Sequence, residues 1–541
     1  MPPASIFTLP YELRYEIYKH YFTLDDGYAF QPGPGKLATS DRRPLDLALM
    51  YTCRLMAEET KDLPLRFNTV SFSTVYHPER SAWAGRFHYQ LDLQLSLQSN
   101  LLVRMAHRLT PDMRSLITLK FPGFMPMLTR TEEPVPRTTR HKEQSYFELG
   151  TYRCLNNLST GQLRWEWYHE NTCLVSQTIT YALRLLAQSH GPELTQLINK
   201  ELPRREATQD ILEFLDKCYE PWAIPSQSVL ATTGLELSDD RVWDRMNRWH
   251  KEDYEKQRYR EKFRFSAAAV AIRFLNSLSI HKRLQLRKMV LREDRAAIAQ
   301  QERHARGLIP FCKENPRLRI ERRVDVLNAI FQKSELSLMS SVPISSRDEP
   351  NIRYELSSHW ITETVANWLL EGLATVDAGM PADAFTLVLD SGPATDLCSD
   401  VFHNVVHRRL AWQTALERCY SQGILAPPSP DNPEYTYCNV SQDLWQALDH
   451  LTNQTSVLRC NFNPGRPWNV DKIFNECSTW DIHKWRLSWS HSSDPRHYNV
   501  LPPLPDWGDT LRENFEMEPK KTRNKDRKRH RVGGPKFSLS Y

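Results

Sequence analysis

The chain has 541 residues, of which 40% are hydrophobic and 11% aromatic, and its formal net charge is +5. This composition excludes a wholly disordered protein, because such chains lack the apolar and aromatic residues that build cores. The positive charge is concentrated in residues 241–333, with a net charge of +13, and in residues 519–541, with +8, whereas the remainder is acidic overall. Charge segregated in this way favours docking to anionic partners, nucleic acid included.

The sequence shows no secretory, membrane-spanning or metal-binding signal. The first thirty residues hold no apolar run typical of a signal peptide, and no later stretch reaches the ~18–20 consecutive apolar residues that a membrane helix requires. The ten cysteines have irregular spacings with no Cys-x-x-Cys pair, which indicates neither a zinc ribbon nor a disulfide framework. We therefore expect a nuclear or cytoplasmic protein with no metal, no cofactor and no membrane partner.

The N-terminal segment predicts a helix with one apolar face. Pro10 suits the first helical position, where its missing N–H would be unpaired anyway. The residues that recur every four positions are Leu9, Leu13, Ile17 and Tyr21. Residues 25–44 are rich in Pro and Gly and cannot continue this helix.

The elements expected next are mainly helical. Residues 45–60 predict a second helix with Leu47, Tyr51 and Leu55 along one side, and the alternation in 69–76 predicts a strand. Further helices are expected at 91–109, 171–201, 206–218 and, highly charged, 239–262; a second strand is expected at 115–121, and 123–142 reads as a mobile loop.

The centre of the chain combines apolar periodicity with more positive charge than any other predicted ordered region. It predicts a helix over 263–276, a strand over 286–294, a turn-rich connection over 307–316 and a second helix over 317–331. Beyond it, helices are expected at 359–374, 396–422 and 442–452, a fourth strand at 384–390, and a buried strand or lid at 480–489.

Short apolar strands separated by helical stretches favour a largely parallel sheet. The fold class expected is α+β to α/β: mostly helical, with a small, largely parallel sheet of short strands, a helical N-terminus and a disordered basic tail. A sheet with irregular leucine-rich-repeat character is an open alternative, although no internal repeat of fixed period is visible. The expected units are 1–80, 81–262, 263–422, 423–510 and 511–541.

Two groups of motifs resemble those of a family of fungal F-box-like proteins. The first is Leu9-Pro-x-Glu-Leu13-Arg-x-x-Ile17, followed by Thr52-Cys-Arg, Glu58-Glu59 and a Phe-Asn pair before a strand. The second is Gly307-Leu-Ile-Pro-Phe-Cys-x-Glu-Asn-Pro with the Arg-rich run after it. The resemblance implies that Leu9, Pro10, Leu13, Ile17 and Tyr21 dock a Skp-type adaptor protein while the body holds a protein target. Residues 25–44 depart from the compact three-helix F-box pattern.

Motifs for catalysis give no support for an enzyme. His403 and His407 have the i, i+4 spacing of a zincin pair, but Asn404 stands where the catalytic Glu would follow the first His. The sequence Asp390-Ser-Gly392 is read as a strand-to-helix turn, and there is no Walker loop, Gly-x-Gly-x-x-Gly or Gly-x-Ser-x-Gly. We therefore predict a chain without enzymatic activity.

Basic residues form two candidate sites. The central ones either make ion pairs with nearby carboxylates or line a groove for an acidic partner or a nucleic-acid backbone; they are Arg287, Lys288, Arg292, Arg317, Arg319, Arg322 and Arg323. The tail resembles a nuclear-import signal through Lys520, Lys521, Arg523, Lys525, Arg527, Lys528, Arg529 and Arg531.

Two functions are therefore expected from the sequence. The first is a non-enzymatic F-box-like interaction protein that serves as a substrate-recognition adaptor of a cullin-type ubiquitin ligase. The alternative is a nuclear nucleic-acid-associated protein that acts through residues 241–333 and the basic tail.

Overall fold

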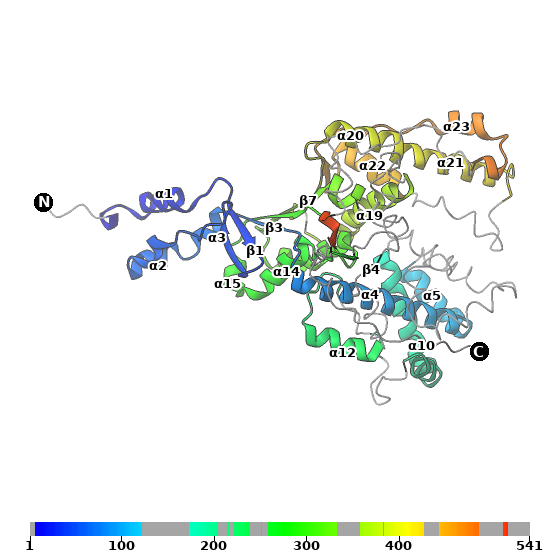
Figure 1. Ribbon diagram of the computed structural model, residues 1–541, viewed down its shortest axis with the longest axis horizontal. Coiled ribbons are helices and arrows are strands. Elements are labelled where there is room, and N and C mark those ends of the chain that lie inside the picture. The colour runs from blue at the N-terminus through cyan, green and yellow to red at the C-terminus, as the bar shows by residue number, and fades with distance from the viewer. Residues whose placement is uncertain are drawn as a thin grey trace, which may run out of the picture.

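The computed structural model describes residues 6–121, 172–202, 212, 215, 220–237, 250–251, 258–332, 358–381, 383–426, 443–485 and 512–517. The predicted loop at 123–142, most of the helix at 206–218 and the basic residues of the tail lie outside these ranges. Figure 1 shows the N-terminal helices at one end and two helical groups around a central sheet.

A seven-stranded sheet forms the centre of the fold, in the order β2-β1-β3-β6-β7-β8-β9. All neighbouring strands are parallel except the β1–β2 hairpin, which confirms the prediction of a largely parallel sheet. From β1 onward the strands follow one another across the sheet in chain order. The strands are β1 (Tyr28–Gln31), β2 (Lys36–Thr39), β3 (Thr69–Ser73), β6 (Lys288–Glu293), β7 (Arg319–Asp325), β8 (Phe385–Asp390) and β9 (Leu458–Cys460).

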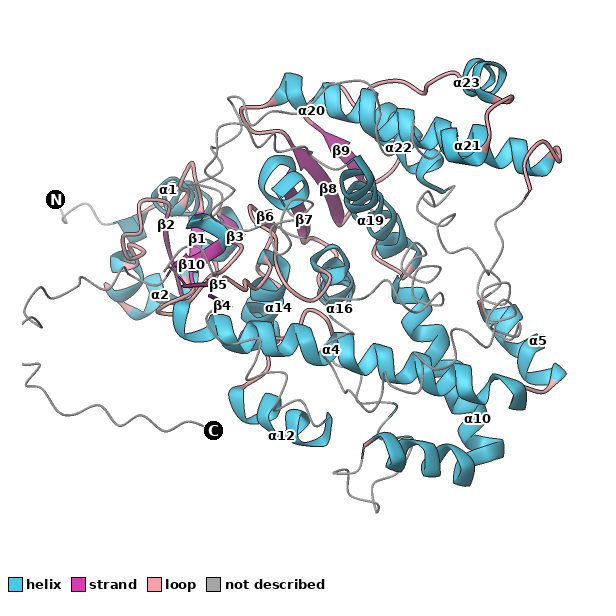
Figure 2. Ribbon diagram, turned by 45° about the vertical axis from the view of Figure 1, so that its right-hand side comes forward, coloured by secondary structure: helices cyan, strands magenta, loops and turns pink. Residues whose placement is uncertain are grey.

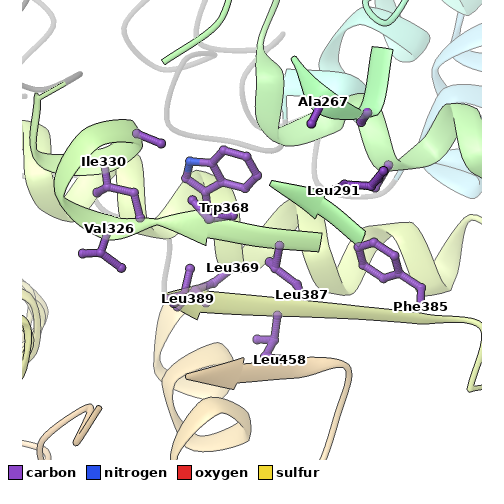
Figure 3. Close-up of a cluster of buried hydrophobic side chains, with 14 of the residues drawn as sticks. Ala267, Leu291, Val326, Ile330, Trp368, Leu369, Phe385, Leu387, Leu389 and Leu458 are labelled. Carbon is purple, nitrogen blue, oxygen red and sulfur yellow. The ribbon is translucent and has the colours of Figure 1, made fainter. Parts of the chain in front are cut away.

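One face of this sheet packs against helices α14 (Ala267–Ser277) and α19 (Ser358–Asp377). The ring of Phe274 in α14 lies 5.4 Å from that of Phe72 in β3, and Gly372 in α19 lies against Leu387 of β8 and Leu458 of β9. Figure 3 shows Trp368 and Leu369 of α19 among Leu387, Leu389 and other core side chains. This layer forms the main hydrophobic core.

The connections in the centre contain more helix than predicted. The expected turn-rich segment at 307–316 is the end of the 3₁₀ helix η4 (Gln301–Leu308) followed by α16 (Ile309–Glu314). After β7 the chain forms the π-helix η5 (Val326–Phe331). The predicted helix at 317–331 is therefore wrong, because its first half is strand β7.

A separate helical unit lies below the sheet in Figure 1. It contains α4 (Pro78–Met105), α5 (Pro111–Lys120) and α10 (Thr172–Glu201), and it has its own core, which includes Leu101 and Leu183. The strand predicted at 115–121 is wrong. The Thr110 hydroxyl accepts a hydrogen bond from the Met113 amide at the start of α5, so an N-cap begins a helix there.

The C-terminal helices and a small second sheet complete the described residues. The helix predicted at 396–422 is observed as α20 (Thr395–Val401), the π-helix η6 (Phe402–His407) and α21 (Arg408–Ser421), and α22 (Asp443–Asn453) and α23 (Val470–Cys477) follow. Trp485 is buried against Trp412 and Trp480 in a short helical segment, so the described part of the 480–489 prediction is not a strand.

The second sheet has the order β10-β5-β4 and joins β10 (Phe515–Met517) to β5 (Arg258–Glu261) and β4 (His250–Lys251). The prediction of a charged helix over 239–262 is wrong at residues 250–251 and 258–261, which form strands β4 and β5. The remaining helices are α1 (Tyr11–Phe22), α2 (Arg54–Thr60), α3 (Leu63–Phe67), α12 (Gln227–Leu237) and α15 (Ile280–Arg283). Figure 2 shows the helices around both sheets.

Candidate partner-binding surfaces

The first candidate surface is the exposed apolar side of α1. The helix begins after Pro10, with Glu12 in its first turn, and its buried face consists of Tyr18 and Phe22, which pack with Met56 and Leu63. The predicted apolar residues lie on the opposite side. Leu13, Ile17 and Tyr21 are 54%, 43% and 39% exposed, Pro10 is exposed and Leu9 is half-buried.

We call Pro10, Leu13, Ile17 and Tyr21 the α1 stripe. Residues that follow one another every three or four positions on a helix form one continuous side, so these four share a face. Phe7 in the short 3₁₀ helix η1 (Ile6–Thr8) and Tyr11 at the start of α1 are also exposed. So are Tyr51 at the end of the 3₁₀ helix η2 (Ala48–Tyr51) and Leu55 in α2. Figure 1 shows α1 and α2 extending away from the rest of the molecule. Apolar side chains gathered on a projecting element are typical of protein-binding surfaces.

The motif residues that carry the F-box-like resemblance hold α1 against α2. Arg14 donates a hydrogen bond from Nε to Glu59 (3.0 Å), and the Tyr18 hydroxyl donates to the same carboxylate (2.6 Å). The hydrogen bond from Arg14 is the main reason why the pKa of Glu59 lies below its usual value, although burial opposes the shift. The Asn68 amide accepts from the Leu24 amide and donates to Phe22 O, and so fixes the end of α1 to the start of β3.

Residues 25–44 separate these helices without disrupting the sheet. They form the β1–β2 hairpin, and β1 pairs in parallel with β3 through Tyr28 and Val70. Gly27 makes the turn into β1 with φ +64°, and a Cβ there would lie 2.3 Å from Thr69 O. The extra segment therefore extends the sheet, while α1 still packs against α2 and α3 through Tyr18, Met56 and Leu63.

The second candidate surface is the uncovered face of the central sheet. Because side chains alternate along a strand, the residues opposite the core face include Lys288 and Arg292 of β6, Arg319 and Arg323 of β7 and Asp390 of β8. All four basic residues are exposed. We call Lys288, Arg292, Arg319 and Arg323 the basic sheet face. It holds four of the seven predicted central basic residues.

The acidic neighbours of this face neutralise part of its charge. Arg323 pairs with Glu321 and lies 3.3 Å from Asp390, and Lys288 lies 3.9 Å from Glu321. Arg319 instead donates to the carbonyl of Pro316 (2.7 Å). Arg292 forms no ion pair with any residue that the structure describes. The face is therefore basic on balance.

Arg322 is not a surface residue. Its side chain is 1% exposed, on the core face of β7, and donates from Nε and Nη2 to Glu293 Oε1 at 2.9 and 2.8 Å. Nη1 donates to Glu302 O, and the guanidinium lies 4.6 Å from the Trp368 ring centroid. Burial alone would raise the pKa of Glu293, but Arg322 and several hydrogen bonds hold it below its usual value. For Arg322 the ion-pair alternative is the correct one.

Arg287 and Arg317 lie just before the amino-terminal ends of β6 and β7, outside the basic sheet face. The Arg287 guanidinium donates to the carbonyls of Leu284 and Leu286. Burial, and then the positive charges of Arg66 and Arg317, lower its pKa. These two residues therefore belong to a separate basic edge.

The candidate catalytic motifs have structural roles. His407 is buried and its Nε2 lies 3.0 Å from Pro464 O, whereas the His403 ring lies near Trp468. In the part of the chain that the structure describes, no cluster of His, Cys, Asp or Glu could hold a metal ion. Gly392 has φ +52° and its amide donates to Asp390 Oδ1, which is the turn expected after β8.

No described helix combines the length and the apolar character that crossing a membrane would require. A scan of protein families, a search of curated proteins and a search of solved structures each found no significant match to this chain.

Proposed function

We propose that the chain is a non-enzymatic F-box-like interaction protein whose α1 stripe docks a Skp-type adaptor and whose body carries a protein target for ubiquitin transfer. The observation that carries this proposal is the exposure of Leu13, Ile17 and Tyr21 on a helix whose other side is already packed. These are the residues that the F-box-like resemblance assigns to adaptor docking.

The body of the protein supports the role of a target carrier. Strands β3, β6, β7, β8 and β9 are parallel and in chain order, and helices pack on one face while the basic sheet face stays exposed. The acidic groups on a target would complement Lys288, Arg292 and Arg319.

The test is binding of the purified full chain to a purified fungal Skp-type adaptor. Docking that buries one Leu is worth about 1.5–3 kcal/mol, so Leu13→Asp and Ile17→Asp should each weaken binding at least tenfold. Leu119→Asp is the matched control, because Leu119 is 84% exposed on α5, outside the α1 stripe. No binding by the wild-type chain, or equal binding by Leu13→Asp and Leu119→Asp, would remove the adaptor proposal.

A second candidate function is binding of a nucleic-acid backbone, and the basic sheet face favours it. Lys288, Arg292 and Arg319 could contact phosphates, and such binding weakens as salt rises. Gel shifts with RNA and DNA across a salt series test this function. The Lys288→Glu/Arg319→Glu variant should reduce the affinity and the salt slope, and so should deletion of 519–541; salt-independent binding would argue against it.

A further inference from the structure

A two-part groove lies where strands β1 and β3 end. The first hollow, of about 300 Å³, is lined by Phe30 at the end of β1, by the hairpin turn at 32–35 and by Phe274 of α14. The second, of about 480 Å³, is lined by Trp83 of α4 and by Trp222 and Pro225. The two hollows share Arg80, Ile224, Phe265 and Arg273, so they adjoin each other. In parallel sheets, ligands bind beyond the carboxyl ends of the strands, which is where this groove lies.

The basic side chains of the groove have no partner among the described residues. Arg80 in the first turn of α4 and Arg273 in α14 are both exposed, and neither guanidinium forms a hydrogen bond or ion pair with a residue in the described ranges. His77 lines the first hollow, and its buried Nδ1 has no hydrogen-bond partner. Glu220 is the acidic residue in the wall of the second hollow, and it accepts a hydrogen bond from Trp222 Nε1 (2.7 Å).

The aromatic walls of the groove form where the rings of Trp222 and Phe263 pack closely against glycines. A Cβ on Gly307 would lie 2.6 Å from Trp222 and from Ile272, so only glycine lets the Trp222 ring lie there. Gly85 makes the same allowance for the ring of Phe263, which lines the first hollow. The hairpin turn adds Pro32 and Pro34. Residues 25–44, which depart from the F-box pattern, thus supply one side of the groove.

We propose that this groove binds a short peptide segment in which a carboxylate or phosphate lies between two apolar side chains. Arg80 and Arg273, which have no ion-pair partner in the described ranges, line both hollows, and a guanidinium binds either anion through paired hydrogen bonds. The apolar walls on each side would take one apolar side chain each. The assignment of this segment to a ubiquitination target rests on the proposed function, whereas the binding itself does not.

Fluorescence anisotropy with the full chain tests this inference. The probes are fluorescein-labelled peptides of sequence Gly-Ser-Phe-Xaa-Phe-Ser-Gly, in which Xaa is Glu, phosphoserine or Gln. We expect the Glu or the phosphoserine peptide to bind at least tenfold more tightly than the Gln peptide, and the stronger of the two identifies the anion. Arg80→Ala and Arg273→Ala should each weaken that binding about tenfold, and Arg80→Lys less.

Arg466→Ala is the control, because Arg466 is exposed and lines neither hollow. Its binding should equal that of the wild type, and all variants should show the same urea midpoint. Equal affinity for all three peptides, or affinity that Arg80→Ala and Arg273→Ala leave unchanged, would overturn the inference. Absence of adaptor binding by the wild-type chain with peptide binding intact would count only against the proposed function, so the two proposals fail separately.

Discussion

Replacement of Arg322 by Met tests whether the buried ion pair holds the central sheet to its helices. Arg322 is 1% exposed and Glu293 is fully buried, so the variant leaves a carboxylate in the core without its cation. Removal of one partner from such a pair costs about 3–5 kcal/mol. Glu293 keeps hydrogen bonds from the Ala267 and Ala268 amides and from the Gln301 side chain, so we expect a loss near 3 kcal/mol.

Urea unfolding followed by circular dichroism measures this loss as a change in the free energy of unfolding. Arg323→Met is the matched control, because Arg323 is the next residue of β7 but is 43% exposed on the opposite face. Exposed ion pairs contribute at most about 1 kcal/mol, so the control should be nearly as stable as the wild type. Equal losses in the two variants would show that the Arg322–Glu293 pair does not dominate the stability of this core.

Two further predictions concern stability. Gly27→Ala should lower the free energy of unfolding by about 1–3 kcal/mol, because φ is +64° and the new Cβ would meet Thr69 O. Gly33→Ala is the control and should change it by less than about 1 kcal/mol, because a Cβ there meets open space. Equal urea midpoints of the two variants would contradict this prediction. Burial, together with Arg322, lowers the pKa of His304 to about 4. Below about pH 6.5 the unfolded chain binds a proton at His304 that the folded chain does not bind, so the free energy of unfolding should fall as the pH drops from about 6.5 to about 4. The variant His304→Gln should reduce the slope of the unfolding free energy against pH by up to about 1.4 kcal/mol per pH unit. An unchanged slope in urea titrations at several pH values would refute the assignment.

The sequence predicted three of the seven strands of the sheet, because these three follow simple periodicity, and it did not predict β1, β2, β7 or β9. Strands β3, β6 and β8 alternate apolar and polar residues or form short apolar runs, and all three were expected. Strand β7 was not, because Arg322 takes a core position that an apolar residue normally holds. The remaining apolar residues, Ile320 and Val324, then have the i, i+4 spacing of a helix.

The candidate sites were predictable to different degrees. Periodicity identified the apolar side of α1, but it could not show that Tyr18 and Phe22 take the buried side and leave Leu13 exposed. The basic sheet face follows from alternation once β7 is known to be a strand. The groove could not be predicted, because Arg273 lies far along the chain from His77 and Arg80 and no local pattern joins them.

The pairing of β3 with β6 leaves β3 without its neighbouring strand while the chain is being synthesised. Roughly 210 residues separate Ser73 from Lys288, yet the two strands pair directly in the sheet. At a translation rate of about 5–20 residues per second, β3 waits roughly 10–40 s for its neighbour to be made. During that interval its backbone N–H and C=O groups on that side have no strand partner, and such edges promote aggregation. We therefore expect the nascent N-terminal half to be most prone to aggregation before β6 is made.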